Sequence, residues 1–118
     1  MLFADNGGGE FDREFRKLIK RVLQEYDLFI IPYDDEIFQR PSLLNGAPPL
    51  WHHSGRDALG IRHNGRLVVF YHQGDLGDAW KDDHGGTPAA SWQAAYNLGV
   101  NVIDYAFRHY QEWLSRQK

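Results

Sequence analysis

The chain has 118 residues, 42% hydrophobic and 25% charged, which is the size and composition of one globular domain or part of one. Its net charge of −3 gives no reason to bind nucleic acid, which selects concentrated basic surfaces, and no apolar run approaches the roughly 20 residues of a membrane span. No cysteine is present, so disulfides, thiolate metal sites and cysteine nucleophiles are excluded.

The N-terminal part predicts a strand, a helix and a second strand. Residues 2–4 form a short apolar run that ends in Asp5, Asn6 and the glycines at 7–9, as a buried strand before a turn would. Apolar residues recur at spacings of three and four over 11–26, which predicts an amphipathic helix. Residues 28–32 predict a second buried strand, stopped by a proline.

The middle of the chain alternates loops with a hairpin. Residues 33–57 show no period and carry several prolines and glycines, so we expect one long irregular loop of a length that is often functional. Asn64 and Gly65 separate two strand-like runs, the strongest short-range signal for a hairpin. Residues 73–86 (QGDLGDAWKDDHGG) are polar and rich in glycine, and we expect a second loop there.

A long helix closes the chain, with Thr87 as its predicted N-cap, Pro88 at its first position and its end near Ser115. One arc of the helix is apolar and consists of Trp92, Tyr96, Gly99, Ile103, Ala106, Phe107, Tyr110 and Leu114. The opposite arc is polar and consists of Asn97, Asn101, Asp104 and Arg108, with an i,i+4 ion pair within it. We expect the polar arc to face water. The order of the elements predicts a layered α/β domain.

Three segments point to a known family when taken together: LFADNGGG near the start, GIRHNGRLVVFYHQGDLGDAW in the middle and AAYNLGVNVIDYAF near the end. They resemble the C-terminal part of a bacterial family of domains of unknown function with a class I glutamine amidotransferase-like, flavodoxin-like fold. The resemblance implies a three-layer α/β domain that lacks its N-terminal strands, so 1–118 would be a single but partial domain. Its relatives often belong to larger proteins, and both a cytoplasmic and an exported location stay open. Where the family often has a His-Pro pair, this sequence has Asp35 and Glu36.

The resemblance has two consequences for function. A half-sheet exposes a strand edge and apolar faces, so we expect a homo-oligomer or a complex with a partner protein, without insertion of this segment into a membrane. Amidotransferase chemistry is not expected, because it needs a cysteine nucleophile. No G-x-S-x-G serine motif replaces that nucleophile.

Polar residues at the predicted strand ends are candidates for ligand binding. Asp5 and Asn6 follow the first strand and Asp75 follows the hairpin, so they can share the edge where open α/β sheets bind ligands. Paired carboxylates there can act as acid and base or hold a hard cation, although the same residues also suit simple turns. Trp80 offers a ring for stacking or a contact with the core, and Asn101 offers an amide to a cleft or to water.

Histidines supply a possible metal site. His53 in the long loop, with His52 as its alternative, joins His72 and Asp75, which have H-x-x-D spacing. Imidazole and carboxylate together can bind zinc, iron or copper. The set is not an established ligand motif, and ordinary structural roles are favoured; His63 and His109 are expected at the surface. Two functions follow: a non-catalytic interaction or ligand-binding module, or a metal-dependent hydrolase.

Overall fold

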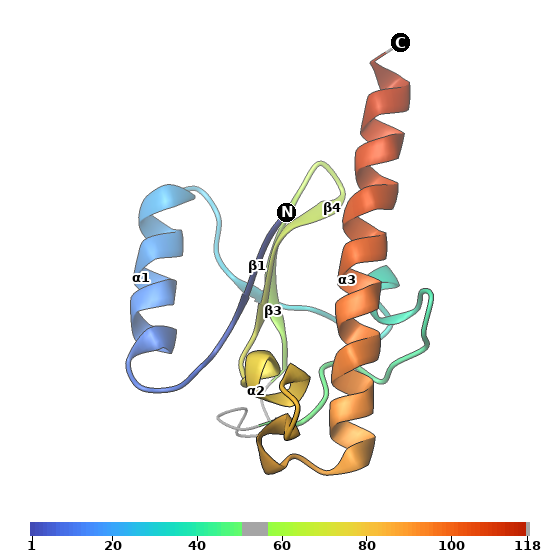
Figure 1. The fold of residues 1–118 in the computed structure, drawn as a ribbon. Helices are drawn as coiled ribbons and strands as arrows, with labels where there is room; N and C mark the ends of the chain where they lie inside the picture. The colour runs from blue at the N-terminus through green and yellow to red at the C-terminus, as the bar shows by residue number, and fades with distance from the viewer. Residues whose placement is uncertain (51–56, 118) are drawn as a thin grey trace.

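Four strands form one mixed sheet in the order β1-β4-β3-β2, as a computed structural model that describes residues 1–50 and 57–117 shows (Figure 1). The strands are β1 (Leu2–Asp5), β2 (Phe29–Ile30), β3 (Leu59–His63) and β4 (Arg66–His72). β1 pairs in parallel with β4, whereas β3 is antiparallel to both β4 and β2. β1 and β2 are therefore the edges of the sheet within the described chain.

Two helices cover the two faces of the sheet, α1 (Phe11–Val22) on one side and α3 (Ala89–Arg116) on the other (Figure 1). Three short helices connect the elements: η1 (Glu36–Phe38), α2 (Leu76–Trp80) and η2 (His84–Gly86). The architecture is thus a layered α/β domain, as predicted. None of the described helices is long and apolar enough to span a bilayer.

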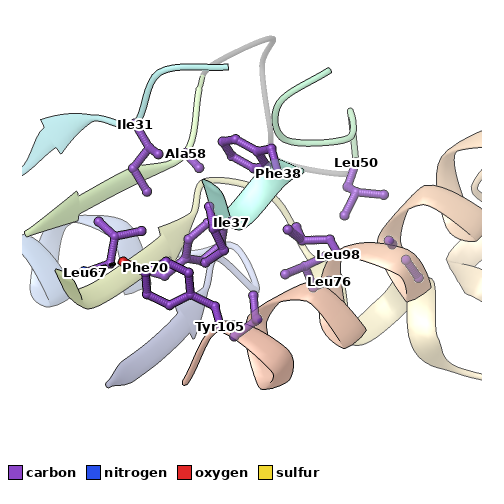
Figure 2. Packing of buried hydrophobic residues seen from close by; sticks show 13 residues of the cluster. Ile31, Ile37, Phe38, Leu50, Ala58, Leu67, Phe70, Leu76, Leu98 and Tyr105 are labelled. Atoms are coloured by element: carbon purple, nitrogen blue, oxygen red, sulfur yellow. Dashed lines mark hydrogen bonds between the residues drawn. The ribbon is translucent and has the colours of Figure 1, made fainter. Parts of the chain in front are cut away.

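The central strand β4 supplies both cores, because successive side chains of a strand point to opposite faces. Val69 and Tyr71 pack with α1, whose Phe15 and Ile19 are the buried residues of that helix. Phe70 packs on the α3 side in the larger core (Figure 2). That core consists of Ile31, Ile37, Phe38, Leu50, Ala58, Leu67, Phe70, Leu76, Ala79, Ala95, Leu98, Val102 and Tyr105. Part of the predicted long loop therefore covers the core, since Ile37, Phe38 and Leu50 come from it.

The predicted hairpin is confirmed. Asn64 and Gly65 have φ values of 51° and 79° between β3 and β4. A two-residue type I′ turn requires positive φ at both positions, which asparagine and glycine tolerate best. Asn64 and Gly65 therefore predict the turn because both residues tolerate the positive φ that it requires.

Several predicted boundaries are wrong. The second strand is Phe29–Ile30 and not 28–32. Ile31 is fully buried and lies outside the strand, although its N–H donates a hydrogen bond to the Ala58 carbonyl at 2.9 Å. The first helix ends at Val22, four residues before the end of its apolar pattern. Pro88 takes the N-cap position predicted for Thr87, and it has no side-chain cap bond. The helix then extends one residue beyond Ser115, to Arg116.

The segment 73–86 is not simply a loop, because it contains α2 and η2. Asp75 caps α2 by accepting a hydrogen bond from the Asp78 N–H, and Leu76 and Ala79 turn into the core. The helix signal here is weak, because it consists of one capping aspartate followed by two apolar residues at a spacing of three. The polar composition of the rest of the segment favoured the prediction of a loop.

Candidate functional site

The carboxyl ends of β1 and β4 lie side by side and bring together the two aspartates predicted there. Asp5 lies opposite His72 in the parallel register, and its Oδ2 accepts a hydrogen bond from the Gly77 N–H at 2.9 Å. Asp75 Oδ1 accepts from the Asp78 N–H, also at 2.9 Å. Both carboxylates therefore flank the first turn of α2 and are engaged with its backbone.

Their proximity changes the acidity of one of them. Burial raises the pKa of Asp75, the hydrogen bond from the Asp78 N–H acts in the opposite direction, and the negative charges of Asp78 and Asp5 raise it further. The net effect is a pKa above the ordinary value of an aspartate. The Asp75 carboxyl can therefore hold a proton more readily than an ordinary aspartate, but its cap bond fixes its orientation.

Asn6 lies buried at the turn after β1 and serves the backbone. Its Oδ1 accepts from the Gly8 N–H at 3.0 Å, and its Nδ2 donates to the Gln73 carbonyl at 3.4 Å. Gly8 and Gly9 have φ values of 98° and 63°, so the turn uses the left-handed region that glycine occupies without strain. The side chain of Asn6 thus closes the turn between β1 and α1.

His72 is fully buried at the end of β4, with both ring nitrogens hydrogen-bonded. Nδ1 accepts from the Gly74 N–H at 2.8 Å, so the ring proton is on Nε2, which donates to the Pro48 carbonyl at 3.0 Å. A histidine ligand must direct a ring lone pair at the metal, and these bonds use the lone pair of Nδ1 and the proton of Nε2. His72 in this arrangement therefore does not fit a metal.

The structure does not test the histidines predicted to join His72 in this site. His53 and its alternative His52 lie outside the described residues, 1–50 and 57–117. Within those ranges, no group of three or more histidine, aspartate or glutamate side chains is placed to hold a metal ion. The site of His53, His72 and Asp75 stays a prediction, without support from the bonds of His72.

Trp80 forms one wall of an apolar groove between β1 and α3. Its indole Nε1 donates to the Ala95 carbonyl at 3.0 Å, and its ring stacks on Phe3 with 6.1 Å between centroids. The ring also rests on Gly99, where a Cβ atom would lie only 3.1 Å from Trp80 Cζ2. The groove has a volume of about 480 Å³ and is lined by Phe3, Trp80, Tyr96, Gly99, Val100, Val102 and Ile103.

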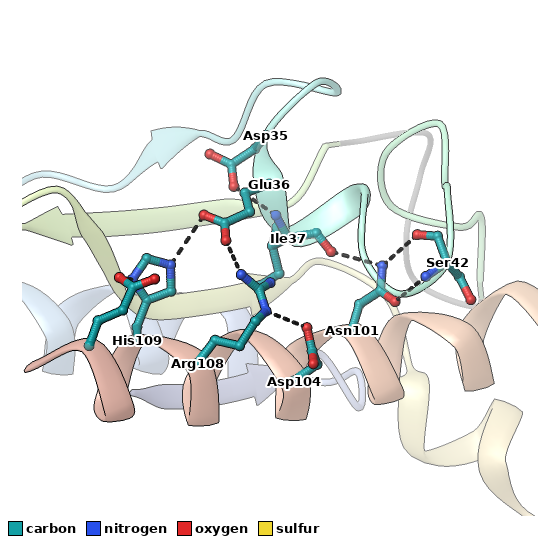
Figure 3. A network of polar contacts seen from close by, with 9 residues as sticks. Asp35, Glu36, Ile37, Ser42, Asn101, Asp104, Arg108 and His109 are labelled. Atoms are coloured by element: carbon teal, nitrogen blue, oxygen red, sulfur yellow. Dashed lines mark hydrogen bonds and ion pairs between the residues drawn. The ribbon is translucent and has the colours of Figure 1, made fainter. Parts of the chain in front are cut away.

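Asn101 lies on the opposite side of α3 and is fully buried, so the prediction of a wet polar arc is wrong at this position (Figure 3). Its Nδ2 donates to the carbonyls of Ile37 at 3.0 Å and Ser42 at 2.8 Å, while its Oδ1 accepts from the Ser42 N–H at 3.0 Å. The amide therefore fastens the segment after η1 to α3 and has no remaining donor for a ligand.

An ion-pair network continues this inward polar side (Figure 3). Arg108 bonds Glu36 through Nη1 and Asp104 through Nε, the latter at 2.7 Å, and His109 Nε2 lies 3.2 Å from Glu36 Oε2. His109 is 15% exposed and packs on Tyr105, so the expectation of a surface histidine is wrong. The polar arc of α3 thus packs on η1 because that segment presents backbone carbonyls and carboxylates to it.

The network also lowers the pKa of Glu36. Burial alone would raise the pKa of this carboxyl, but hydrogen bonds from Arg108 and His109, together with their charges, outweigh it. The bond to Glu36 is in turn the main cause of a raised pKa for Arg108. Asp35, which precedes Glu36, caps η1 and pairs with Arg62 at 2.6 Å.

The apolar arc of α3 faces outward as a result. Five of its side chains and the adjacent Val100 are each between 40% and 63% exposed, and we call this row the seam: Tyr96, Val100, Ile103, Phe107, Tyr110 and Leu114. The groove adjoins the seam, because Tyr96, Val100 and Ile103 line both. The sequence predicted that the opposite, polar arc would face water, but the buried residues of α3 are Ala95, Leu98, Asn101, Val102 and Tyr105.

The fold and this surface define the class of the protein. It is a layered α/β domain with a mixed sheet, in which α3 makes polar bonds on its inner side and exposes apolar side chains on its outer side. Residues 1–107 match the family model of a domain of unknown function, DUF4159, and the chain belongs to that family. No curated protein shows a significant match to the chain. Membership of a family of unknown function is therefore confirmed, while the amidotransferase-like fold and the bacterial origin stay predictions.

Proposed function

We propose that this DUF4159 domain is a non-catalytic interaction module that binds an amphipathic helix along the seam and in the adjoining groove. The observation that carries the proposal is the orientation of α3, which directs Asn101 and Arg108 toward the segment 36–42 and leaves the six apolar side chains of the seam exposed in a row. Six large side chains at about half exposure amount to roughly 600 Å² of apolar surface, as large as the largest patch on a typical monomer.

A helix is the occupant that the shape favours. The seam is a narrow row along five turns of one helix, and ridges of side chains on a second helix fit such a row. The groove widens it on the side of β1, where Phe3 and Trp80 form an apolar floor and wall. Burial of the seam would stabilise the complex through the hydrophobic effect, at about 25 cal/mol per Å² before the costs of association.

The non-catalytic assignment is supported by the use of polar groups at the strand ends. His72, Asn6 and Asn101 direct their side chains to backbone groups, and Asp5 and Asp75 bond the first turn of α2. These bonds stabilise the fold and do not converge on the groove. The parallel β1–β4 pair with helices on both faces is also what a flavodoxin-like, amidotransferase-like domain would have, and we include that fold in the proposal.

The test uses a labelled peptide as the helix. The probe is a 28-residue amphipathic peptide, the same length as α3, with leucine at the positions that correspond to the seam residues of α3. Fluorescence anisotropy reports its binding. We expect saturable binding that Val100→Glu weakens at least tenfold, because the carboxylate would be buried against the probe.

The matched control is Val22→Glu, the same substitution at an exposed valine of α1 on the other face of the sheet. It should leave binding unchanged. Absence of saturable binding to the unaltered protein, or equal loss in the two variants, would contradict the proposed role.

A further inference from the structure

We infer that the helix bound on the seam is α3 of a second copy of this chain, packed antiparallel across a twofold axis. The inference rests on the proposed function, because it names the partner of the same surface. Three features of α3 carry it: the period of the seam, the order of residue sizes along it and the area that two copies would bury.

The period of the seam is that of a coiled coil. From Tyr96 to Leu114 the spacings are four, three, four, three and four, which places an apolar residue at every a and d position of a heptad. Such a 3.5-residue repeat keeps a row of side chains facing one neighbouring helix along its whole length. No charged residue interrupts the seam.

The order of side-chain sizes favours an antiparallel second copy. In that arrangement the twofold axis passes between Ile103 and Phe107, and each of these faces the other residue in the second copy. The next layer joins Val100 to Tyr110, and the outer layer joins Tyr96 to Leu114. Every layer then combines one aromatic and one aliphatic side chain, which fills the space between the helices evenly.

A parallel arrangement would not do so. It would place Phe107 on Phe107, Tyr110 on Tyr110 and Val100 on Val100, so that wide and narrow layers follow one another. Antiparallel packing also brings Trp113 of the second copy beside Gly99, at the groove. Trp113 is 42% exposed in the single chain, and Gly99 is the smallest residue on that flank of the seam.

The area is sufficient for a specific dimer. Two seams of roughly 600 Å² bury roughly 1,200 Å², the lower limit of stable interfaces, and Trp113 adds to this. Asp104 lies beside the seam, so in the dimer it would lie near Asp104 of the second copy. The ion pair with Arg108 at 2.7 Å offsets the repulsion between these two carboxylates. A dimer that dissociates on dilution is therefore expected.

Cysteine cross-linking tests the arrangement directly, because the chain has no cysteine of its own. A mixture of Val100→Cys and Tyr110→Cys proteins should form a mixed disulfide dimer under mild oxidation. Either variant alone should not, because the two copies of one position would lie about 15 Å apart along the helix axis. Efficient cross-linking of Val100→Cys with itself would overturn the antiparallel arrangement.

Sedimentation of the uncross-linked protein gives the second readout. We expect a dimer that Val100→Glu converts to a monomer and that Val22→Glu leaves intact, with circular dichroism confirming that both variants are folded. A monomer at all concentrations up to several hundred micromolar would overturn the second copy as partner. If that monomer still binds the leucine-containing probe, only this inference fails; if it does not, the proposed interaction role fails as well.

Discussion

Replacing Asn101 with alanine tests which side of α3 packs on the domain. The substitution removes three hydrogen bonds to backbone groups of Ile37 and Ser42, at 2.8 to 3.0 Å, and leaves those groups without their partner. At about 1 kcal/mol for each bond, the loss is about 3 kcal/mol. The better helix propensity of alanine returns about 0.5 kcal/mol, so the net loss is about 2.5 kcal/mol.

The assay is urea unfolding followed by circular dichroism at the helix band. A loss of this size corresponds to a fall in Tm of about 10 °C for a chain of this length. The matched control is Asn97→Ala, one turn earlier on the same helix, where the side chain is exposed. Because Asn97 has no buried bond to lose, its variant should stay within about 0.5 kcal/mol of the unaltered protein.

The reasoning fails if Asn101→Ala unfolds at the same urea concentration as the unaltered protein, or if Asn97→Ala loses as much stability. Either result would mean that the polar arc of α3 does not pack on the segment after η1. The outward orientation of the seam would then lose its structural basis, and both proposals with it.

Three further predictions concern charge and metal. Glu36→Gln should be less stable than the unaltered protein at pH 7, by up to about 1 kcal/mol, because the lowered pKa of Glu36 stabilises the fold while the carboxylate is ionised. The difference should shrink as the pH falls below the ordinary pKa of a glutamate and vanish below the lowered pKa of Glu36. Urea unfolding at several pH values measures this, and a pH-independent difference would contradict it. Asp75→Asn keeps a capping side chain and removes a carboxylate whose raised pKa disfavours its ionised form in the fold, so this variant should be at least as stable at pH 7 and equal below about pH 3.9. If Asp75→Asn were less stable than the unaltered protein at pH 7, the negative charge of Asp75 beside Asp78 and Asp5 would not destabilise the fold. Elemental analysis of tag-free protein purified without chelator should find far less than one equivalent of zinc, iron or copper, because both ring nitrogens of His72 are occupied; a full equivalent lost in His72→Ala would restore the metal-dependent hydrolase.

Local signals predicted the parts of the fold that depend on local chemistry. The Asn64–Gly65 turn follows from residues that are neighbours in sequence and is confirmed. The first strand is present as Leu2–Asp5, but the expectation of a buried strand is wrong, because β1 is an edge of the sheet and Leu2 is 49% exposed. The first helix ends at Val22, although Leu23 and Tyr26, which continue its apolar pattern, still pack against the core on the α1 side. An apolar period therefore predicts which residues contact the core but not where the helix ends. The short helix α2 was missed because two buried apolar residues do not offset a polar average.

The orientation of α3 could not be predicted from its own sequence, because the helix carries apolar residues on both sides. Its burial depends on what the segment 36–42 presents to it. Once the Ile37 and Ser42 carbonyls face the helix, a buried asparagine is more favourable than an aliphatic residue, which would leave them without partners. The candidate site depends on the same unknown: the sequence makes Trp80 a candidate for ligand binding, which stays a prediction, but it does not indicate which residues of α3 line the groove beside Trp80.

The parallel pairing of β1 with β4 has a consequence for synthesis of the chain. Leu2 of β1 lies opposite Val69, so β1 cannot pair with its neighbouring strand until β4 has been synthesised. At a synthesis rate of about 5 to 20 residues per second, that interval is roughly 3 to 13 seconds. The hairpin of β3 and β4 can form at once from neighbouring residues, whereas β1 waits as an exposed apolar segment. We therefore expect β1 to stay exposed during synthesis until β4 has been added to the chain.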